Sequence, residues 1–416
     1  MSDQSIIVEG WRFLPHSYAI ANQFQLLEML KRPQLKIYHQ DAPYISQDWQ
    51  TVSGLHPTEA EEKLREIPAP NIDQVASATL RMVAPWNLAP SNSKKTAVFA
   101  CTEWGAVTQS IIRGMKIKSL ADAHGNSDSM IITASDWSKQ GFIRSGAIPE
   151  RVKVVPLGVD PQIYFPLNTT EKLQLRQQMG VKADDFIFLN VGLMCNHSQG
   201  IGYLLRAFAK LIERYPGRSL KLILKGRDAI FPSQDSIRQA SHAVLTEQEI
   251  EAVRSRIIYV GKTLTFTELA QIYQIADVYV SPYIAEGFNL PVLEAIACGL
   301  PVICTAGGPT DDFIHPDFAL PIESKLHSNH NSDGDLLYGV IPNFEHLLYL
   351  MEYIIENTEF KQQAQISGPA WVKNRFTWQQ VVDQLLEILI PAVKPVLPLT
   401  NYQLSQDPYN FQPIIV

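Results

Sequence analysis

Apolar and polar positions follow two periods in turn along most of the chain. Short apolar runs rich in β-branched and aromatic residues, such as TAVFAC at 96–101 and FIFLNVG at 186–192, are typical of buried strands. Longer stretches follow them in which apolar residues recur every three or four positions, as in GYLLRAFAKLIERY at 202–215. Because strands and helices alternate, the pattern predicts an α/β protein with parallel sheets.

The alternation occurs twice, which predicts two Rossmann-like domains with a cleft between them. The first domain is expected to span residues 1–165 and the second residues 166–375. A last amphipathic helix and a proline-containing tail follow over residues 376–416. Within the first domain, residues 42–95 are expected to be irregular, apart from a helix within TEAEEKLREI at 58–67.

Some local expectations follow from single residues. Ser17 and Ser135 each precede a helical pattern, and a serine hydroxyl readily accepts a free N–H at a helix start. The last helix, from about Phe376, is expected to return to the first domain. Trp371 and Trp378 are expected to pack at that crossing.

Composition narrows the function classes. The chain has 416 residues, of which 46% are hydrophobic and 19% are charged, so it can bury two cores and is not disordered. Its formal net charge of −7 argues against general nucleic-acid binding, which needs a basic face. The four cysteines form no CxxC pair, and no basic segment precedes the first apolar run. We therefore expect a cytoplasmic protein, with peripheral membrane contact left open.

The sequence EGFNLPVLEAIACGLPVICT, at residues 286–305, carries the clearest candidate chemistry. A strand over 277–283 ends just before it, and Pro291 suits the first turn of a helix. Glu286 then lies at the carboxyl end of a strand, where open α/β sheets bind ligands. Glu294 lies one turn into the helix, whose free N–H groups attract anions. Either glutamate alone would suit a solvated loop or a helix dipole, but the pair predicts a site.

The segment AEGFNLPVLEAIACGLPVICTAGGPTD, at residues 285–311, resembles the signature of the retaining group-1 glycosyltransferases of GT-B architecture, which carry two glutamates separated by seven residues. The resemblance covers roughly residues 130–385. It implies an enzyme that moves a hexosyl or related sugar from a nucleotide diphosphate sugar to an acceptor, with retention of configuration. The first domain would bind the acceptor and the second the donor. The donor is a substrate, and neither a separate cofactor nor a metal is expected.

The resemblance also implies roles for individual residues. Glu286 would be catalytic and face the transferred sugar, and Glu294 would bind the ribose hydroxyls. The diphosphate would lie on the loop and helix start formed by Gly287, Phe288, Asn289 and Leu290.

One departure from the family pattern concerns the phosphate-binding cations. Leu193 stands where the family commonly has arginine, and Gln199 where it commonly has lysine. Lys225 and Arg227, in LKGRD, are the candidate replacements, because a diphosphate needs cationic partners. The alternative is that both are solvated loop cations.

The first domain offers less specific candidates. His16 follows the first strand and is a candidate catalytic contact to donor or acceptor sugar; the alternative is a turn histidine without such a role. Asp41 and Glu103 also follow strands, and either is a candidate general base for the acceptor. Asp333, in the sequence DGD, is interpreted as part of a turn rather than as a metal ligand.

Two other classes of function stay open. One is a non-catalytic or partner-dependent protein that kept the fold, which the residues at 193 and 199 favour. The other is a different sugar-nucleotide enzyme, such as an epimerase. Dinucleotide binding is disfavoured because no strand is followed by GxGxxG. The acceptor is expected to be a carbohydrate, a lipid-linked molecule or a protein.

Overall fold

The computed structural model describes residues 4–393 and contains two parallel six-stranded sheets, one in each half of the chain. This confirms the predicted α/β fold class. The first sheet has the strand order β2-β1-β3-β4-β5-β6. Its strands are β1 (Gln4–Gly10), β2 (Leu35–Asp41), β3 (Ala78–Met82), β4 (Thr96–Phe99), β5 (Met130–Thr133) and β6 (Val152–Val154).

Helices cover this sheet. They are α1 (Ser17–Leu30), α2 (Thr58–Arg65), α3 (Gln109–Met115), α4 (Leu120–Gly125), α5 (Asp136–Arg144) and the 3₁₀ turn η1 (Pro149–Arg151). Strand β3 lies inside the segment expected to be irregular, so that expectation was wrong. Its sequence ATLRM includes Arg81, which is buried because its side chain pairs with Glu9 at 2.8 Å and donates to the carbonyl of Asn87. The buried charge hides the strand pattern.

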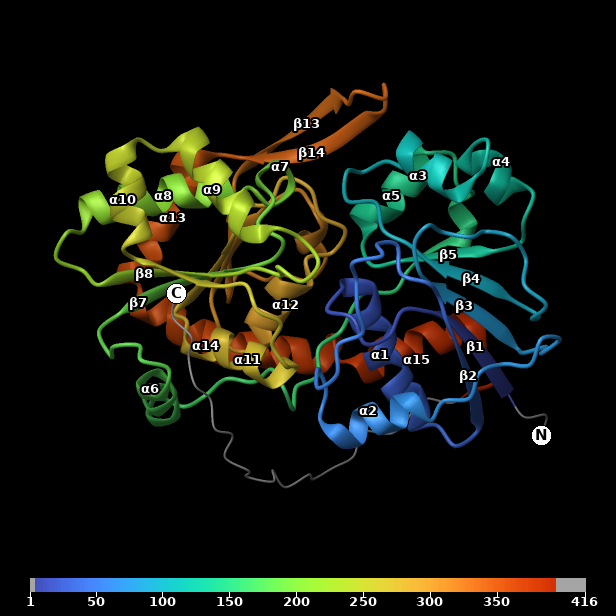
Figure 1. The fold of residues 1–416 in the computed structure, drawn as a ribbon. Coiled ribbons are helices and arrows are strands. Elements are labelled where there is room, and N and C mark those ends of the chain that lie inside the picture. Colours follow the sequence, from blue (N-terminus) through green and yellow to red (C-terminus); the bar gives the residue numbers. More distant parts are fainter. Residues whose placement is uncertain (1–3, 394–416) are drawn as a thin grey trace.

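The second sheet has the order β12-β11-β10-β7-β8-β9 and lies beside the first in Figure 1. Its strands are β7 (Phe186–Val191), β8 (Leu220–Lys225), β9 (Ile257–Val260), β10 (Val278–Ser281), β11 (Val302–Thr305) and β12 (Ala319–Ile322). The helical segments of this half are α6 (Thr169–Gln178), α7 (Asn196–Gln199), α8 (Ile201–Arg214), α9 (Ser233–Val244), α10 (Glu247–Arg254), α11 (Phe266–Ile275), α12 (Leu290–Ala297), η2 (Pro309–Asp312), α13 (Phe344–Glu356) and α14 (Thr358–Arg375).

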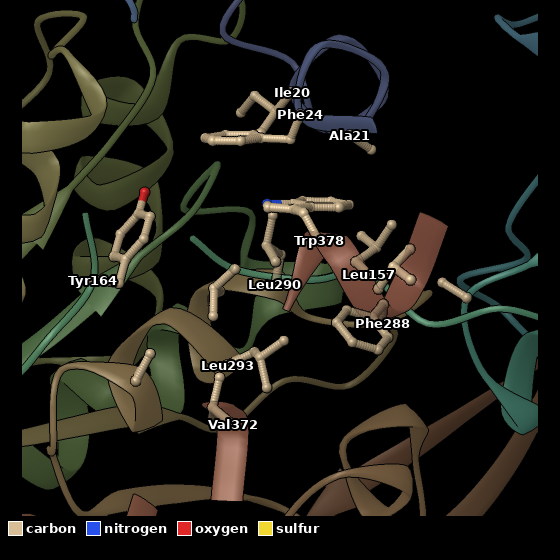
Figure 2. Packing of buried hydrophobic residues seen from close by; sticks show 14 of the residues in the cluster. Ile20, Ala21, Phe24, Leu157, Tyr164, Phe288, Leu290, Leu293, Val372 and Trp378 are labelled. Carbon is tan, nitrogen blue, oxygen red and sulfur yellow. The ribbon is translucent and has the colours of Figure 1, made fainter. Parts of the chain in front are cut away.

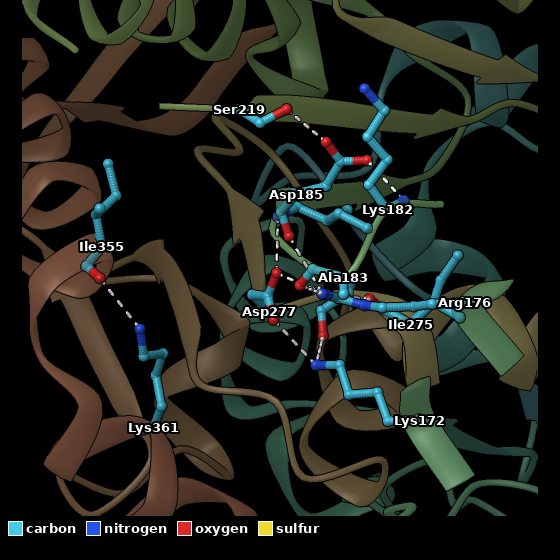
Figure 3. A network of polar contacts seen from close by, with 12 residues as sticks. Lys172, Arg176, Lys182, Ala183, Asp185, Ser219, Ile275, Asp277, Ile355 and Lys361 are labelled. Atoms are coloured by element: carbon cyan, nitrogen blue, oxygen red, sulfur yellow. Dashed lines mark hydrogen bonds and ion pairs between the residues drawn. The ribbon is translucent and has the colours of Figure 1, made fainter. Parts of the chain in front are cut away.

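A buried polar network ties α6 to the second sheet (Figure 3). Asp277, just before β10, accepts hydrogen bonds from Arg176 at 2.7 Å and from the backbone of Ile187 at 2.8 Å, and pairs with Lys172 at 3.0 Å. Burial by itself would raise the pKa of Asp277, but the charges of Lys172 and Arg176 lower it below its usual value. The helix that follows the interdomain linker is therefore fixed to the second domain.

The two domains are joined on one side by a continuous apolar core, which we call the hinge core (Figure 2). The last helix, α15 (Trp378–Leu389), packs on α1, and the ring of Trp378 stacks on Phe24 with centroids 5.4 Å apart. Gly158 permits the chain to cross here, because a Cβ at that position would lie 2.8 Å from the backbone nitrogen of Trp378. Trp371, on α14, packs against the same core, and its indole N–H donates to the carbonyl of Phe313 at 3.0 Å.

On the other side, an antiparallel hairpin extends from the second domain toward the first (Figure 1). It consists of β13 (Ser324–His330) and β14 (Leu336–Pro342), and we call it the clasp hairpin. Asp335 at its tip accepts from the backbone N–H of Gln109 at 2.9 Å, and Asp333 pairs with Arg113 at 2.8 Å. Asp333 lies in the turn between the two strands, as expected.

No helix within residues 4–393 has the length and apolar character needed to cross a membrane. The exact domain boundaries remain a prediction, and the end of the predicted tail lies outside the described residues.

Candidate active site

Both signature glutamates lie where strand β10 ends and α12 begins. Asn289, the residue before α12, has a left-handed backbone with φ of 72°, and its side chain donates to the Ser281 hydroxyl at 3.0 Å. This contact fixes the loop that carries Glu286 to the end of the strand. The loop and helix start, Gly287–Leu290, are buried between the domains. The structure therefore brings Glu286, Glu294 and the predicted diphosphate loop together.

Glu294 is a buried carboxyl group, with 5% of its surface exposed. Its Oε2 accepts a hydrogen bond from the Tyr273 hydroxyl at 2.7 Å. Burial raises the pKa of Glu294, while the Tyr273 bond and the charge of Arg227 act in the opposite direction. The buried Tyr164 hydroxyl lies near the same carboxyl and has no geometrically satisfactory hydrogen bond of its own. Tyr164 and Tyr273 thus place two hydroxyl groups beside the Glu294 carboxyl.

Glu286 lies beside Gln199, whose amide nitrogen is 3.4 Å from Glu286 Oε1. Burial raises the pKa of Glu286 to about 8, and the neighbouring carboxylate of Glu103 adds to this shift. The hydrogen bond from Gln199 and the charge of Arg227 oppose the shift. In the unliganded protein this carboxyl therefore loses its proton at a higher pH than a solvated glutamate does.

The residue at 199 has a definite structural role despite its departure from the family pattern. Gln199 Oε1 accepts from the backbone N–H of Met194 at 2.8 Å. The side chain folds over Gly192, where a Cβ would lie 2.6 Å from Gln199 Oε1. Gln199 therefore connects the loop after β7 to Glu286. In place of a cation, this position supplies a neutral amide that orients the candidate catalytic carboxyl.

The two candidate replacement cations lie in different environments. Lys225 is 5% exposed, and its Nζ donates to the carbonyl of Gly226. Burial lowers the pKa of Lys225 to about 7, and the charge of Arg227 contributes to this shift. Arg227 reaches across to the first domain, where it donates to the carbonyl of Pro15 at 3.1 Å. Its charge lowers the pKa of both Glu286 and Glu294, so Arg227 lies near both carboxyl groups.

His16 enters the site from the start of α1. Its Nδ1 accepts from the backbone N–H of Tyr18 at 3.2 Å, so His16, and not Ser17, caps this helix. The expected cap was wrong by one residue because an imidazole nitrogen takes the place of a hydroxyl. Burial, followed by the charge of Arg227, lowers the pKa of His16 to about 4. The ring is therefore neutral near pH 7 with its proton on Nε2, which makes it a hydrogen-bond donor.

The two other candidates in the first domain differ sharply. Asp41 is engaged by Arg12 through bonds of 2.9 and 2.6 Å. Burial would raise its pKa, but the Arg12 hydrogen bond and charge outweigh burial and lower the pKa of Asp41. Glu103 packs its Cγ against Gly287, 3.9 Å from where a Cβ would stand. Glu103 is exposed at the surface, but the protein packed beside its carboxyl partly desolvates that group and raises its pKa.

The site also includes residues that sequence reasoning did not single out. Tyr273, on the buried face of α11, and Tyr164, in the interdomain linker, had no local signal beyond their apolar surroundings. Among the described residues, no group of three or more His, Cys, Asp or Glu side chains is placed to hold a metal ion.

Known proteins resemble this chain in sequence over its second domain. A family model described as "Glycosyl transferases group 1" matches residues 185–321, which include both glutamates and the loop after β7. An uncharacterized glycosyltransferase of Methanocaldococcus jannaschii is 24% identical over 260 residues, covering 62% of this chain and 59% of the relative. D-inositol 3-phosphate glycosyltransferase 2 of Catenulispora acidiphila is 32% identical over 179 residues, covering 43% of this chain and 40% of the relative. The matched regions thus span less than two thirds of these curated relatives.

Solved structures extend the likeness to almost the whole chain. The Anabaena protein Alr3699/HepE, in complex with UDP and glucose, has a TM-score of 0.64 at 16% identity, covering 93% of this chain and 99% of that one. Sucrose-phosphate synthase from Thermosynechococcus elongatus has a TM-score of 0.64 at 18% identity, covering 92% and 98%. At these identities the likeness establishes the fold. Residues 185–321 thus match the group-1 glycosyltransferase family, and the chain as a whole has the two-domain GT-B fold.

Proposed function

We propose that this protein transfers a sugar from a nucleoside diphosphate sugar to an acceptor, with retention of anomeric configuration. The observation that carries the proposal is the arrangement of Glu286 and Glu294 on either side of the α12 start, with Arg227 acting on both. A nucleoside diphosphate sugar has three parts that need partners. The anion site at the helix start suits the diphosphate, the buried carboxyl of Glu294 suits the ribose hydroxyls, and the carboxyl of Glu286 at the domain junction suits the transferred sugar. UDP and UDP-glucose, present in the Anabaena structures, are the natural first probes.

In the proposed complex, each part of the donor has a partner. The ribose hydroxyls donate to Glu294 Oε1, since Oε2 is already engaged by Tyr273. The diphosphate lies on the N–H groups at the start of α12 and pairs with Arg227 and Lys225. A nearby diphosphate favours the charged form of Lys225, whose pKa of about 7 otherwise leaves it partly neutral.

The transferred sugar lies between Glu286 and the first domain. Glu286 accepts a hydrogen bond from a sugar hydroxyl, held in place by Gln199, and lies next to the positive charge that develops as the anomeric bond to the phosphate breaks. His16 donates from Nε2 to the sugar or the acceptor. The proposal keeps the expectation that no separate cofactor is needed, and transfer in the presence of EDTA tests the part that concerns metals.

The test begins with binding and ends with stereochemistry. We expect a nucleoside diphosphate to raise the melting temperature, because a ligand that binds only the folded state stabilises it. The purified protein is then expected to release nucleoside diphosphate from the matching nucleotide sugar, and NMR of the product is expected to show the donor's anomeric configuration. Binding without any cleavage would instead support a non-catalytic protein, and inversion would refute retention.

A pair of variants tests the cations. Lys225→Ala and Arg227→Ala are both expected to lose affinity for UDP far more than for uridine, because only UDP carries the diphosphate. Arg238→Ala, which removes an exposed cation on α9, is the control and is expected to change neither affinity. Equal losses for UDP and uridine would show that a cation does not contact phosphate.

A further inference from the structure

The loop Cys101–Gly105, which follows β4, is held from both domains. Within the first domain, Trp137 Nε1 donates to the carbonyl of Glu103 at 2.9 Å. From the second domain, the backbone N–H of Tyr338 in the clasp hairpin donates to the carbonyl of Trp104 at 2.9 Å. The Trp104 ring also lies parallel to the His197 ring, with centroids 6.3 Å apart. These contacts fix the backbone on both sides of the Glu103 side chain.

The same loop packs directly on the loop that carries Glu286. A Cβ at Gly287 would lie 2.9 Å from Cys101 Cβ and 3.9 Å from Glu103 Cγ, so only glycine allows this approach. Ser135, which caps α5 in the first domain, donates from its hydroxyl to the carbonyl of Gly287 at 2.6 Å. Two carboxyl groups from different domains, Glu103 and Glu286, therefore lie close enough for the charge of Glu103 to raise the pKa of Glu286.

Glu103 is also the free carboxyl among the first-domain candidates. Within residues 4–393 no hydrogen bond or ion pair engages its side chain, whereas Asp41 is held by two bonds from Arg12. His16 keeps its proton on Nε2, because Nδ1 accepts the helix-capping bond from Tyr18. A general base needs an oxygen or nitrogen atom that is free to take the proton of the acceptor hydroxyl, and the unengaged carboxyl of Glu103 offers such an atom.

We propose that Glu103 is the general base of the transfer, an inference that rests on the proposed function. In the step, the bond between the anomeric carbon and the phosphate oxygen breaks, and its electron pair leaves with the nucleoside diphosphate. A bond forms between the anomeric carbon and the acceptor oxygen. The proton of the acceptor hydroxyl passes to the Glu103 carboxylate. The alternative base is a phosphate oxygen of the leaving group, which requires nothing of Glu103.

The charged groups around Glu103 and Glu286 are consistent with Glu103 as the base. The titratable and charged groups that act on it are Arg227, Tyr18, Cys101 and Cys195. Because like charges resist a second ionisation, the two carboxyls lose their protons in two steps. Burial, followed by the neighbouring Glu103 carboxyl, raises the pKa of Glu286, and burial also raises the pKa of Glu103. Gln199 engages Glu286, whereas no hydrogen bond within residues 4–393 engages the Glu103 side chain, so Glu103 is the member of the pair left free for the acceptor hydroxyl.

The experiment measures nucleotide release from UDP-glucose, or from the nucleotide sugar that the binding screen identifies, with water as the acceptor. Glu103→Gln is expected to lower turnover by about 10²-fold, the usual scale for losing a general base. UDP affinity, measured by calorimetry, is expected to stay within about twofold of wild type, because the base does not contact the nucleotide. Glu103→Ala is expected to recover activity when formate is added, because a small carboxylate can occupy the vacated space. Asp122→Asn, on a surface helix of the same domain, is the matched control.

The possible outcomes distinguish the role of Glu103 as general base from the proposed glycosyltransferase function. A Glu103→Gln protein that releases nucleotide at nearly the wild-type rate would overturn the role of Glu103 and leave the proposed function intact. A structural role for Glu103 would give a different result. Turnover would be slower in both variants, formate would not rescue Glu103→Ala, and the pH–rate profile of Glu103→Gln would match the wild type. This result would also overturn the inference. A wild-type protein that cleaves no nucleotide sugar would overturn the proposed function and this inference together.

Discussion

The two contacts that join the domains, the hinge core and the clasp hairpin, differ in chemical character. The hinge core is apolar and buried: Trp378 on α15 is 2% exposed and stacks on Phe24 of α1. The clasp hairpin instead meets the first domain through polar contacts: at Asp333 and Asp335 near its tip, and through the Tyr338 backbone and ring, which contact Trp104 and Arg144. Buried apolar area stabilises a contact permanently, whereas exposed ion pairs contribute little and exchange readily with water.

This difference matters because the site lies between the two joins. Phe288 and Leu290, beside the predicted diphosphate loop, belong to the hinge core, and Trp104, next to Glu103, contacts the clasp hairpin. One side of the site is therefore fixed, and the other is held by contacts that can break. We expect substrates to enter on the clasp side while the hinge core stays intact.

The largest effect is expected from the hinge core. Trp378→Ala removes a buried ring and leaves a cavity, which typically costs about 3–5 kcal/mol of unfolding free energy. Urea denaturation measures this loss. Tyr349→Ala, an aromatic truncation at a residue that is 57% exposed, is expected to change stability by less than about 0.5 kcal/mol. Equal losses in both variants would show that the hinge core is no more stabilising than an exposed surface.

Glu286 lies between the two joins, and its role in catalysis should depend on both of them. Glu286→Gln is expected to keep UDP affinity near wild type but to lower turnover by about 10²–10³-fold, the scale for one lost electrostatic contact at a transition state. Gln keeps the shape and one acceptor, so the fold should survive. Steady-state nucleotide release measures the effect. An unchanged rate would remove Glu286 from the catalytic machinery.

Nucleotide binding should need the hinge side alone. Glu294→Ala is expected to weaken UDP binding by about 1.5–3 kcal/mol, the range for a charged hydrogen-bonding partner. Glu294→Gln is the matched variant, because it can still accept the hydrogen bond from Tyr273. Calorimetry with UDP measures both variants. Unchanged affinity would show that the ribose does not contact this residue.

The strongest parts of the fold and the site could be predicted because their signals are local. The start of α12 follows from Pro291 and the apolar run around it, and both glutamates follow from that placement. Strand β3 was missed because Arg81 is neutralised by Glu9, a residue distant in sequence. The clasp hairpin was missed for a related reason: its polar strands pair with each other and with another domain. The contacts of Gln199 and Tyr273 with the glutamates likewise depend on long-range packing.

The raised pKa of Glu286 predicts a stability change with pH. The folded protein binds this proton more tightly than the unfolded chain, so its stability is highest below the ordinary glutamate pKa and falls as pH rises toward about 8. Glu286→Gln removes this dependence and is expected to raise the melting temperature at pH 9 relative to wild type, by about 2–3 °C. At pH 4 the two proteins should melt together. The opposite order at pH 9 would refute the assigned shift.

The smallest effect is expected at the clasp hairpin, and it tests the comparison most directly. Asp335→Ala removes the carboxylate that accepts from the Gln109 backbone at 2.9 Å, an exposed contact whose loss should cost about 0.5 kcal/mol or less. Global stability should therefore hardly change. Hydrogen exchange at the Gln109 amide should nevertheless quicken, because the variant opens the clasp more often while the hinge core keeps the domains together. Added salt should quicken exchange in the wild type as well, since it screens the neighbouring pair of Arg113 and Asp333. Asp235→Ala breaks a comparable exposed pair with Arg238 inside the second domain and should leave exchange at Gln109 unchanged. If exchange at Gln109 is as slow in Asp335→Ala as in the wild type, the clasp hairpin is not a separable contact, and the two joins act as one.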